Sequence, residues 1–224
     1  MRKFHVPGVV AVLAALTLTG CGALQPGTAV EVGEERISLD QVDEIAADFC
    51  SALEPQLEAE AQTFPHSFFR SGIAGTLALR SVADQLAEDY GVTGEDSDQY
   101  LETVAGLRQQ IASVPEDLRD SVLEVQTAPP YVEAVQAAVG EVVLDGRGEY
   151  ADFVAAGTDE FETWIAENGV EFDPVLGTRT KDGGLTAEDG SVSFAVSEMA
   201  KNGQVEEPNS VTARLLPATQ RCGR

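Results

Sequence analysis

Apolar residues in the middle of the chain recur at the three- and four-residue spacing of amphipathic helices. Ser38 with Gln41 forms a capping-box pattern, which predicts a helix that begins there. A second helix is predicted over 67–90, with Gly91 as the residue that ends it, and a third over 95–112. The apolar stripes of these helices are Val42, Ile45, Phe49, Leu53 and Leu57, then Phe69, Ile73, Val82, Leu86 and Tyr90, then Tyr100, Val104, Leu107 and Ile111.

Prolines and glycines divide the next part of the chain. Pro115 suits the first turn of a fourth helix that reaches about Gln126. Pro129 and Pro130 cannot donate backbone hydrogen bonds, so they predict a break and the start of a fifth helix. Residues 145–148 are typical of a turn. The fifth helix carries Val132, Val135, Val139 and Val142, and a sixth over 149–167 carries Phe153, Phe161, Trp164 and Ile165.

Strand-like patterns occur towards the two ends. Residues 29–32 alternate, 33–35 form a turn and 36–37 are extended again. The later segments predict strands at 170–173 and 176–180, a mobile loop at 181–191, a helical turn or two at 192–199 and a polar, extended remainder. The pattern therefore predicts a mainly α-helical, multi-helix domain with a small β-sheet formed by the N- and C-terminal segments.

The first residues form a targeting pattern. Arg2 and Lys3 precede an apolar run, Val6 to Leu18, that is too short to span a bilayer stably. Leu18-Thr19-Gly20-Cys21 follows and resembles the lipobox of bacterial lipoproteins. The resemblance implies a signal peptide over 1–20, acylation of Cys21, a lipidated tether over 21–28 and a domain over 29–224. It also implies anchoring at the extracytoplasmic face of the cell membrane. An ordinary cleaved signal peptide is the alternative.

The formal net charge of −24 restricts the partners. Residues 1–20 hold two basic residues and no acid, so the remainder carries about −26. Nucleic acid is not expected as a partner, because its phosphates require a basic surface. The negative charge also argues against binding flat on anionic lipid, so lipid at Cys21 would have to hold the protein at the membrane. The acidity serves either solubility or a specific function.

The chain has three cysteines, Cys21, Cys50 and Cys222. If Cys21 carries lipid, two remain outside the cytoplasm, where disulfides persist. We therefore predict a Cys50–Cys222 disulfide, with two free buried thiols as the alternative. A metal site is not expected, because only one histidine, His66, lies beyond residue 20.

The segment Thr28–Ser38, TAVEVGEERIS, is similar to the opening strand, glycine turn and helix entry of the trigger factor/SurA peptide-binding superfamily. Residues 170–177, VEFDPVLG, are similar to a late strand of lipoproteins with this N-terminal domain, with Val175 and Leu176 in place of a basic and an aromatic residue. The resemblance to SurA and PrsA implies binding of unfolded, exported polypeptides. Many members also carry a parvulin prolyl-isomerase domain, and the interval after Gly169 is too short for one.

Catalytic patterns are not evident. The sequence has no nucleophile elbow, phosphate loop, zinc motif or dinucleotide fingerprint, so we expect no cofactor and no catalytic residue. His66 lies in an aromatic segment and is expected to have a packing or surface role. Glu34–Glu35 and Glu206–Glu207 lie in predicted turns, where they would form a solvated surface rather than an acid/base pair.

Six aromatic residues have two interpretations: Phe64, Phe68, Phe69, Phe153, Phe161 and Trp164. They would either line a surface for apolar peptides or fill the core. Helical spacing favours the core for Phe153, Phe161 and Trp164, whereas Phe64 and Phe68 lie near a predicted loop and fit either role. The peptide-binding residues therefore stay undetermined.

Three functional hypotheses follow. The first is a membrane-anchored, chaperone-like protein that binds unfolded or exported polypeptides without catalysis. The second is an envelope adaptor or structural lipoprotein that binds one folded partner, because a fold does not fix a function. The third is a degenerate peptidyl-prolyl isomerase relative, which the absence of a parvulin-sized insert makes the weakest.

Overall fold

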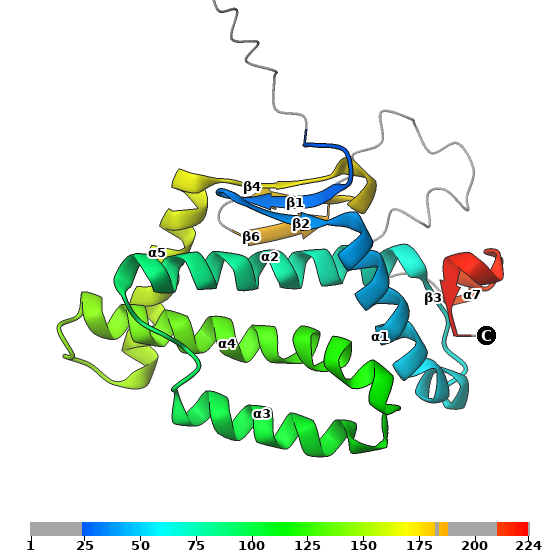
Figure 1. Cartoon of the computed structure of the whole chain (residues 1–224), viewed down its shortest axis with the longest axis horizontal. Helices are drawn as coiled ribbons and strands as arrows, with labels where there is room; N and C mark the ends of the chain where they lie inside the picture. The colour runs from blue at the N-terminus through cyan, green and yellow to red at the C-terminus, as the bar shows by residue number, and fades with distance from the viewer. Residues whose placement is uncertain (1–23, 182–183, 188–209, 224) are drawn as a thin grey trace, which may run out of the picture.

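The computed structural model describes residues 24–181, 184–187 and 210–223. These residues form a mainly helical domain with a small antiparallel sheet, so the predicted fold class is confirmed (Figure 1). Beyond the main helices, short 3₁₀ turns occur at η1 (Ile111–Ser113), η2 (Glu116–Leu118), η3 (Pro174–Leu176) and η4 (Ala218–Gln220). The helices are α1 (Leu39–Ala59), α2 (His66–Tyr90), α3 (Asp98–Gln110), α4 (Arg119–Val143), α5 (Tyr150–Asn168) and the short α7 (Ser210–Ala213).

The sheet joins the early and the late strands, as predicted. Its order is β2-β1-β4, all antiparallel, and Val30 lies opposite both Ile37 and Phe172. Pairing of an N-terminal strand with a strand that follows α5 closes the domain. The strands are β1 (Thr28–Val32), β2 (Glu35–Ser38) and β4 (Val170–Phe172).

The molecule is built in layers around α2. Figure 1 shows the sheet on one side of α2 and α4 on the other, with α3 outside α4. Both sides of α2 are therefore buried, and its alanines allow close packing. The residues that dominate this core include Val30, Val32, Val42, Val82, Leu86, Val135 and Val139.

Two local signals in the sequence act as predicted. The Ser38 hydroxyl accepts a hydrogen bond from the Gln41 backbone N–H at 3.1 Å and caps the start of α1. Gly91 ends α2 in the left-handed conformation, with φ of +65°. Asp173 caps η3 in the same way, by accepting from the Val175 N–H at 2.8 Å, although this cap was not predicted.

The predicted break at Pro129–Pro130 is wrong. Both prolines lie inside α4, which runs unbroken from Arg119 to Val143. They remove backbone donors, and this loss is tolerated because α4 packs against α2, α3 and α5. Tertiary burial therefore overrides the local preference at this position.

The segment after β4 also differs from the prediction. Leu176, which was predicted to begin a strand, is instead the last residue of η3, and the extended part is β5 (Thr178–Lys181). Instead of a loop throughout 181–191, β6 (Gly184–Ala187) pairs antiparallel with β5. The predicted helical turn at 192–199, the Glu206–Glu207 pair, residues 1–20 and Cys21 lie outside the described residues.

The predicted disulfide between Cys50 and Cys222 is present, with 5.6 Å between the Cα atoms. The strand that carries Cys222, β7 (Arg221–Cys222), does not join the main sheet. It pairs antiparallel with β3 (Phe64–Pro65), with Phe64 opposite Cys222. Among the described helices, none is long and apolar enough to cross a bilayer.

Candidate functional site

Four phenylalanines gather where α1, β3 and the start of α2 meet. The ring of Phe64 stacks on Phe68 with 5.6 Å between centroids. Phe69 contacts both of these rings edge-on, at 5.9 Å from Phe64 and 5.6 Å from Phe68. Phe49, on α1, completes the group at 6.1 Å from Phe69. We refer to Phe49, Phe64, Phe68 and Phe69 as the aromatic cluster.

The aromatic cluster extends from the core to solvent. Phe49 and Phe69 pack against the buried core, Phe64 is half-buried, and Phe68 is 43% exposed. Exposed aromatic side chains that are held in position by neighbouring rings can contact apolar ligands without much loss of side-chain entropy. This arrangement can bind an apolar segment but supplies no group for covalent chemistry.

The other predicted aromatic residues lie elsewhere. Phe161 and Trp164 are buried core residues on α5, and Phe153 is half-buried on the same helix. The Trp164 indole N–H donates to Asp89 at 3.0 Å, so its polar group is satisfied within the domain. The core interpretation therefore holds for Phe161 and Trp164, and only Phe64, Phe68 and Phe69 come together as candidates.

The C-terminal residues pack against β3, which carries Phe64 of the aromatic cluster. Residues 210–223, which we call the C-terminal strap, include α7, η4 and β7. The strap contacts β3 through α7 and β7, and β7 also contacts α1 and α2. Figure 1 places the strap at the end of the molecule where α2 begins.

The polar candidates that the structure describes are His66, Glu34 and Glu35. His66 is the half-buried first residue of α2, and in the described residues no group of three His, Cys, Asp or Glu side chains is placed to hold a metal. Glu35 accepts a hydrogen bond from the Ser81 hydroxyl, so it serves to join β2 to α2. Its neighbour Glu34 is exposed.

Tyrosine–carboxylate contacts are the main electrostatic feature of the helical layers. Tyr131 is buried, and its hydroxyl donates to Asp84 at 2.6 Å while the Arg80 guanidinium lies 4.5 Å from its ring centroid. Burial, and then the hydrogen bond to Asp84, raise the pKa of Tyr131 well above its usual value. A phenol that keeps its proton at neutral pH is not poised as a base or nucleophile, so this contact has a structural role.

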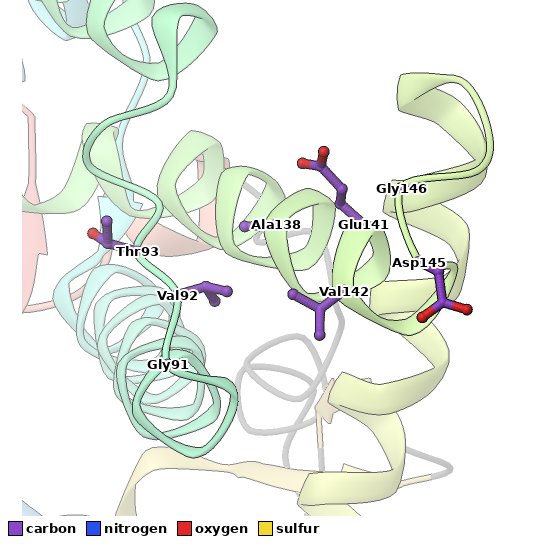
Figure 2. A pocket seen from close by; sticks show the side chains of 8 residues that line it. All are labelled: Gly91, Val92, Thr93, Ala138, Glu141, Val142, Asp145 and Gly146. Carbon is purple, nitrogen blue, oxygen red and sulfur yellow. The ribbon is translucent and has the colours of Figure 1, made fainter.

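A surface hollow of about 730 Å³ lies between the end of α2 and the end of α4. Figure 2 shows Val92 and Val142 directed into it, whereas the carboxylates of Glu141 and Asp145 point away. Asp145 is paired with Arg147 at 2.9 Å. Because no polar groups converge on the hollow, it lacks the orienting contacts of a ligand site.

Phe49 belongs to the apolar stripe of the first predicted helix, and its position beside Phe69 was not predicted. The position of Phe49 next to Cys50 was nevertheless a usable signal, because a disulfide to Cys222 brings this part of the helix close to the C-terminal residues. The contact of the strap with β3 had no such signal in the sequence. Strands β3 and β7 have two residues each, which is too short to show an alternating pattern.

The chain matches no protein-family model, and comparison with curated proteins and with solved structures gives no significant match.

Proposed function

We propose that this protein is a chaperone-like, non-enzymatic binder of unfolded or exported polypeptides, anchored by lipid at Cys21 to the extracytoplasmic face of the cell membrane. The observation that carries the proposal is the aromatic cluster, in which Phe68 is 43% exposed beside Phe64 and Phe69. The resemblance of Thr28–Ser38 to the SurA and PrsA opening segment supports the same function.

Binding would proceed by reversible burial of apolar segments against the exposed side of the aromatic cluster. Each segment would gain ring contacts with Phe68 and Phe64, which already stack on one another. Such contacts select for apolar and aromatic character rather than a fixed sequence. The acidic surface, with a net charge of −24, would keep a loaded complex soluble.

The test is suppression of aggregation. The purified full chain is mixed at increasing ratios with a chemically unfolded protein, and light scattering follows aggregation. We expect Phe68→Ala to reduce the suppression several-fold, because it removes the most exposed ring of the cluster. Leu101→Ala on α3 is the matched control, because Leu101 is 52% exposed and α3 packs on α4, away from β3.

Equal loss in both variants would show that general surface apolarity, rather than the aromatic cluster, is responsible. If the folded wild type fails to slow aggregation of several unfolded proteins, the proposal is wrong. Co-purification of one stoichiometric folded partner would then favour the adaptor alternative.

A further inference from the structure

The C-terminal strap lies where an extended ligand would contact the aromatic cluster. Strand β7 adds to β3 in antiparallel register, with Cys222 opposite Phe64 and Arg221 opposite Pro65. This is the geometry by which extended peptides add to an exposed strand. At its other end, the strap reaches the loop before β3, where the Arg214 guanidinium donates to the Ala61 carbonyl.

Close packing accompanies this pairing. Cys222 is fully buried, and a side chain at Gly223 would lie 2.5 Å from the Gln62 carbonyl and 3.3 Å from Cβ of Leu57. The strap therefore covers a strip made of Leu57 and the segment 61–64. Thr63 and Leu57 are buried in this strip, and Phe64 is half-buried.

The strap itself buries little. Ala213 and Cys222 are its two buried side chains, while Val211 is 70% and Leu215 67% exposed. Its polar contacts with the loop include the close bond from the Arg214 guanidinium to the Ala61 carbonyl and two long ones. The long contacts are Thr63 N–H to the Ser210 hydroxyl at 3.5 Å and Arg214 Nε to the Thr63 hydroxyl at 3.4 Å. Two small buried side chains contribute little against the entropy of ordering fourteen residues, so the Cys50–Cys222 bond supplies a covalent restraint on the strap in addition to its pairing with β3.

We propose that the C-terminal strap is a disulfide-locked occupant of the polypeptide site, and that reduction of Cys50–Cys222 opens the strip formed by Leu57 and residues 61–64 to an extended, apolar client segment. This inference rests on the proposed function, because it adds a second state of the polypeptide-binding site, in which the strap is released and more of the surface is accessible. Within the strap, β7 stands in for the client, because Arg221–Cys222 is an extended segment already paired with β3.

The opening step is thiol–disulfide exchange with a dithiol. One thiolate of the dithiol attacks the Cys50 sulfur, which belongs to the more exposed partner of the pair, and Cys222 leaves as a thiolate that takes up a proton. The second thiol of the reagent then resolves the mixed disulfide and releases the Cys50 thiol. Two electrons pass to Cys50 and Cys222, and the dithiol becomes a disulfide.

Hydrogen exchange and binding are measured on the purified full chain, oxidised and then reduced with dithiothreitol. The ligand is fluorescein-labelled lactalbumin that has been reduced and carboxymethylated, because it is unfolded and has no thiols to react. We expect reduction to abolish protection in 210–223, to leave α4 protected, and to tighten binding at least tenfold. The Cys50→Ser/Cys222→Ser double variant should bind the labelled lactalbumin with the affinity of the reduced chain, and dithiothreitol should not change that affinity.

If the Cys50→Ser/Cys222→Ser variant does not fold, the test still stands, because the wild-type protein is folded before its disulfide is reduced. Unchanged protection of the strap, unchanged affinity or loss of protection throughout the helices would each overturn the proposal. If only the oxidised chain binds the probe, the strap proposal is wrong but the proposed function is still supported. A freed strap with no binding in either state would overturn both.

Discussion

At the residue scale, Gly33 is fixed by its surroundings as well as by its backbone. Its φ is +55°, in the region that favours glycine, and it connects β1 to β2. A Cβ there would lie 2.9 Å from Oε1 of Gln85 and 3.1 Å from the Trp164 ring. The glycine in the turn between β1 and β2 is therefore favoured both by its backbone conformation and by the packing of α2 and α5 against it.

We predict that Gly33→Ala lowers the free energy of unfolding by about 1–3 kcal/mol, because it combines an unfavourable φ with overpacking. Gly72→Ala is the control. Gly72 lies in α2 with helical φ, and a Cβ at this position would have no atom within 4 Å, so alanine should be neutral or stabilising by about 0.5–1 kcal/mol. Urea denaturation measures both, and equal stabilities of the two variants would contradict this account.

The tyrosines make stability depend on pH in the alkaline range. The pKa of Tyr90 is raised by its hydrogen bond to Glu160, and burial raises the pKa of Tyr150 to about 12. The pKa of Tyr131 is raised as well, mainly by burial. Below pH 10 both the folded and unfolded states keep these protons, so this contribution is constant. Above pH 10 the unfolded state loses them first, and stability falls as the pH rises.

We predict that stability declines from pH 10 to 12, with a contribution from Tyr131 of up to about 1.4 kcal/mol per pH unit. Tyr131→Phe should remove that contribution and make the decline shallower. Urea denaturation at pH 8, 10, 11 and 12 measures it. An identical slope in the variant and the wild type would show that Tyr131 does not govern the alkaline loss.

At the element scale, α4 and α5 pack closely through two glycines. A Cβ on Gly140 would lie 1.8 Å from the Phe153 carbonyl oxygen, and one on Gly157 would lie 1.8 Å from the Gln136 carbonyl oxygen. These contacts are with backbone atoms, which cannot rotate away. The two helices can therefore approach this closely only if both positions lack side chains.

We predict that Gly140→Ala lowers the free energy of unfolding by about 3 kcal/mol or more, because the helices must separate. Gly106→Ala on α3 has no atom within 4 Å of the new methyl group and should be harmless. Thermal denaturation of the two variants gives the comparison. Little change on Gly140→Ala would mean that the α4–α5 contact is too loose to exclude a side chain.

Element boundaries were predictable where a local group fixes them. Ser38 caps α1 and Gly91 ends α2, and both signals depend on neighbouring residues alone. Pro129 and Pro130 gave a misleading signal, because burial of α4 on three neighbours outweighs their local preference. The β5–β6 hairpin was missed since residues 181–187 lack the apolar alternation of a buried strand.

At the scale of the whole molecule, the cysteine count was enough to predict the disulfide but not the location of its strand. The bond spans 172 residues, and the chain-entropy model gives roughly 5 kcal/mol as an upper value for such a loop. The pairing of β7 with β3 involves two residues on each side and cannot be read from sequence. The aromatic cluster adjoins that pairing through Phe64, so only part of the candidate site and its surroundings was predictable.

The measurement that tests the central claim most directly is aggregation of an unfolded protein in the presence of the full chain, its Phe68→Ala variant and its Leu101→Ala variant. We predict that the wild type and Leu101→Ala slow aggregation to the same extent and that Phe68→Ala is several-fold weaker. No effect of the folded wild type, under oxidising or reducing conditions, would contradict the claim that this protein binds unfolded polypeptides.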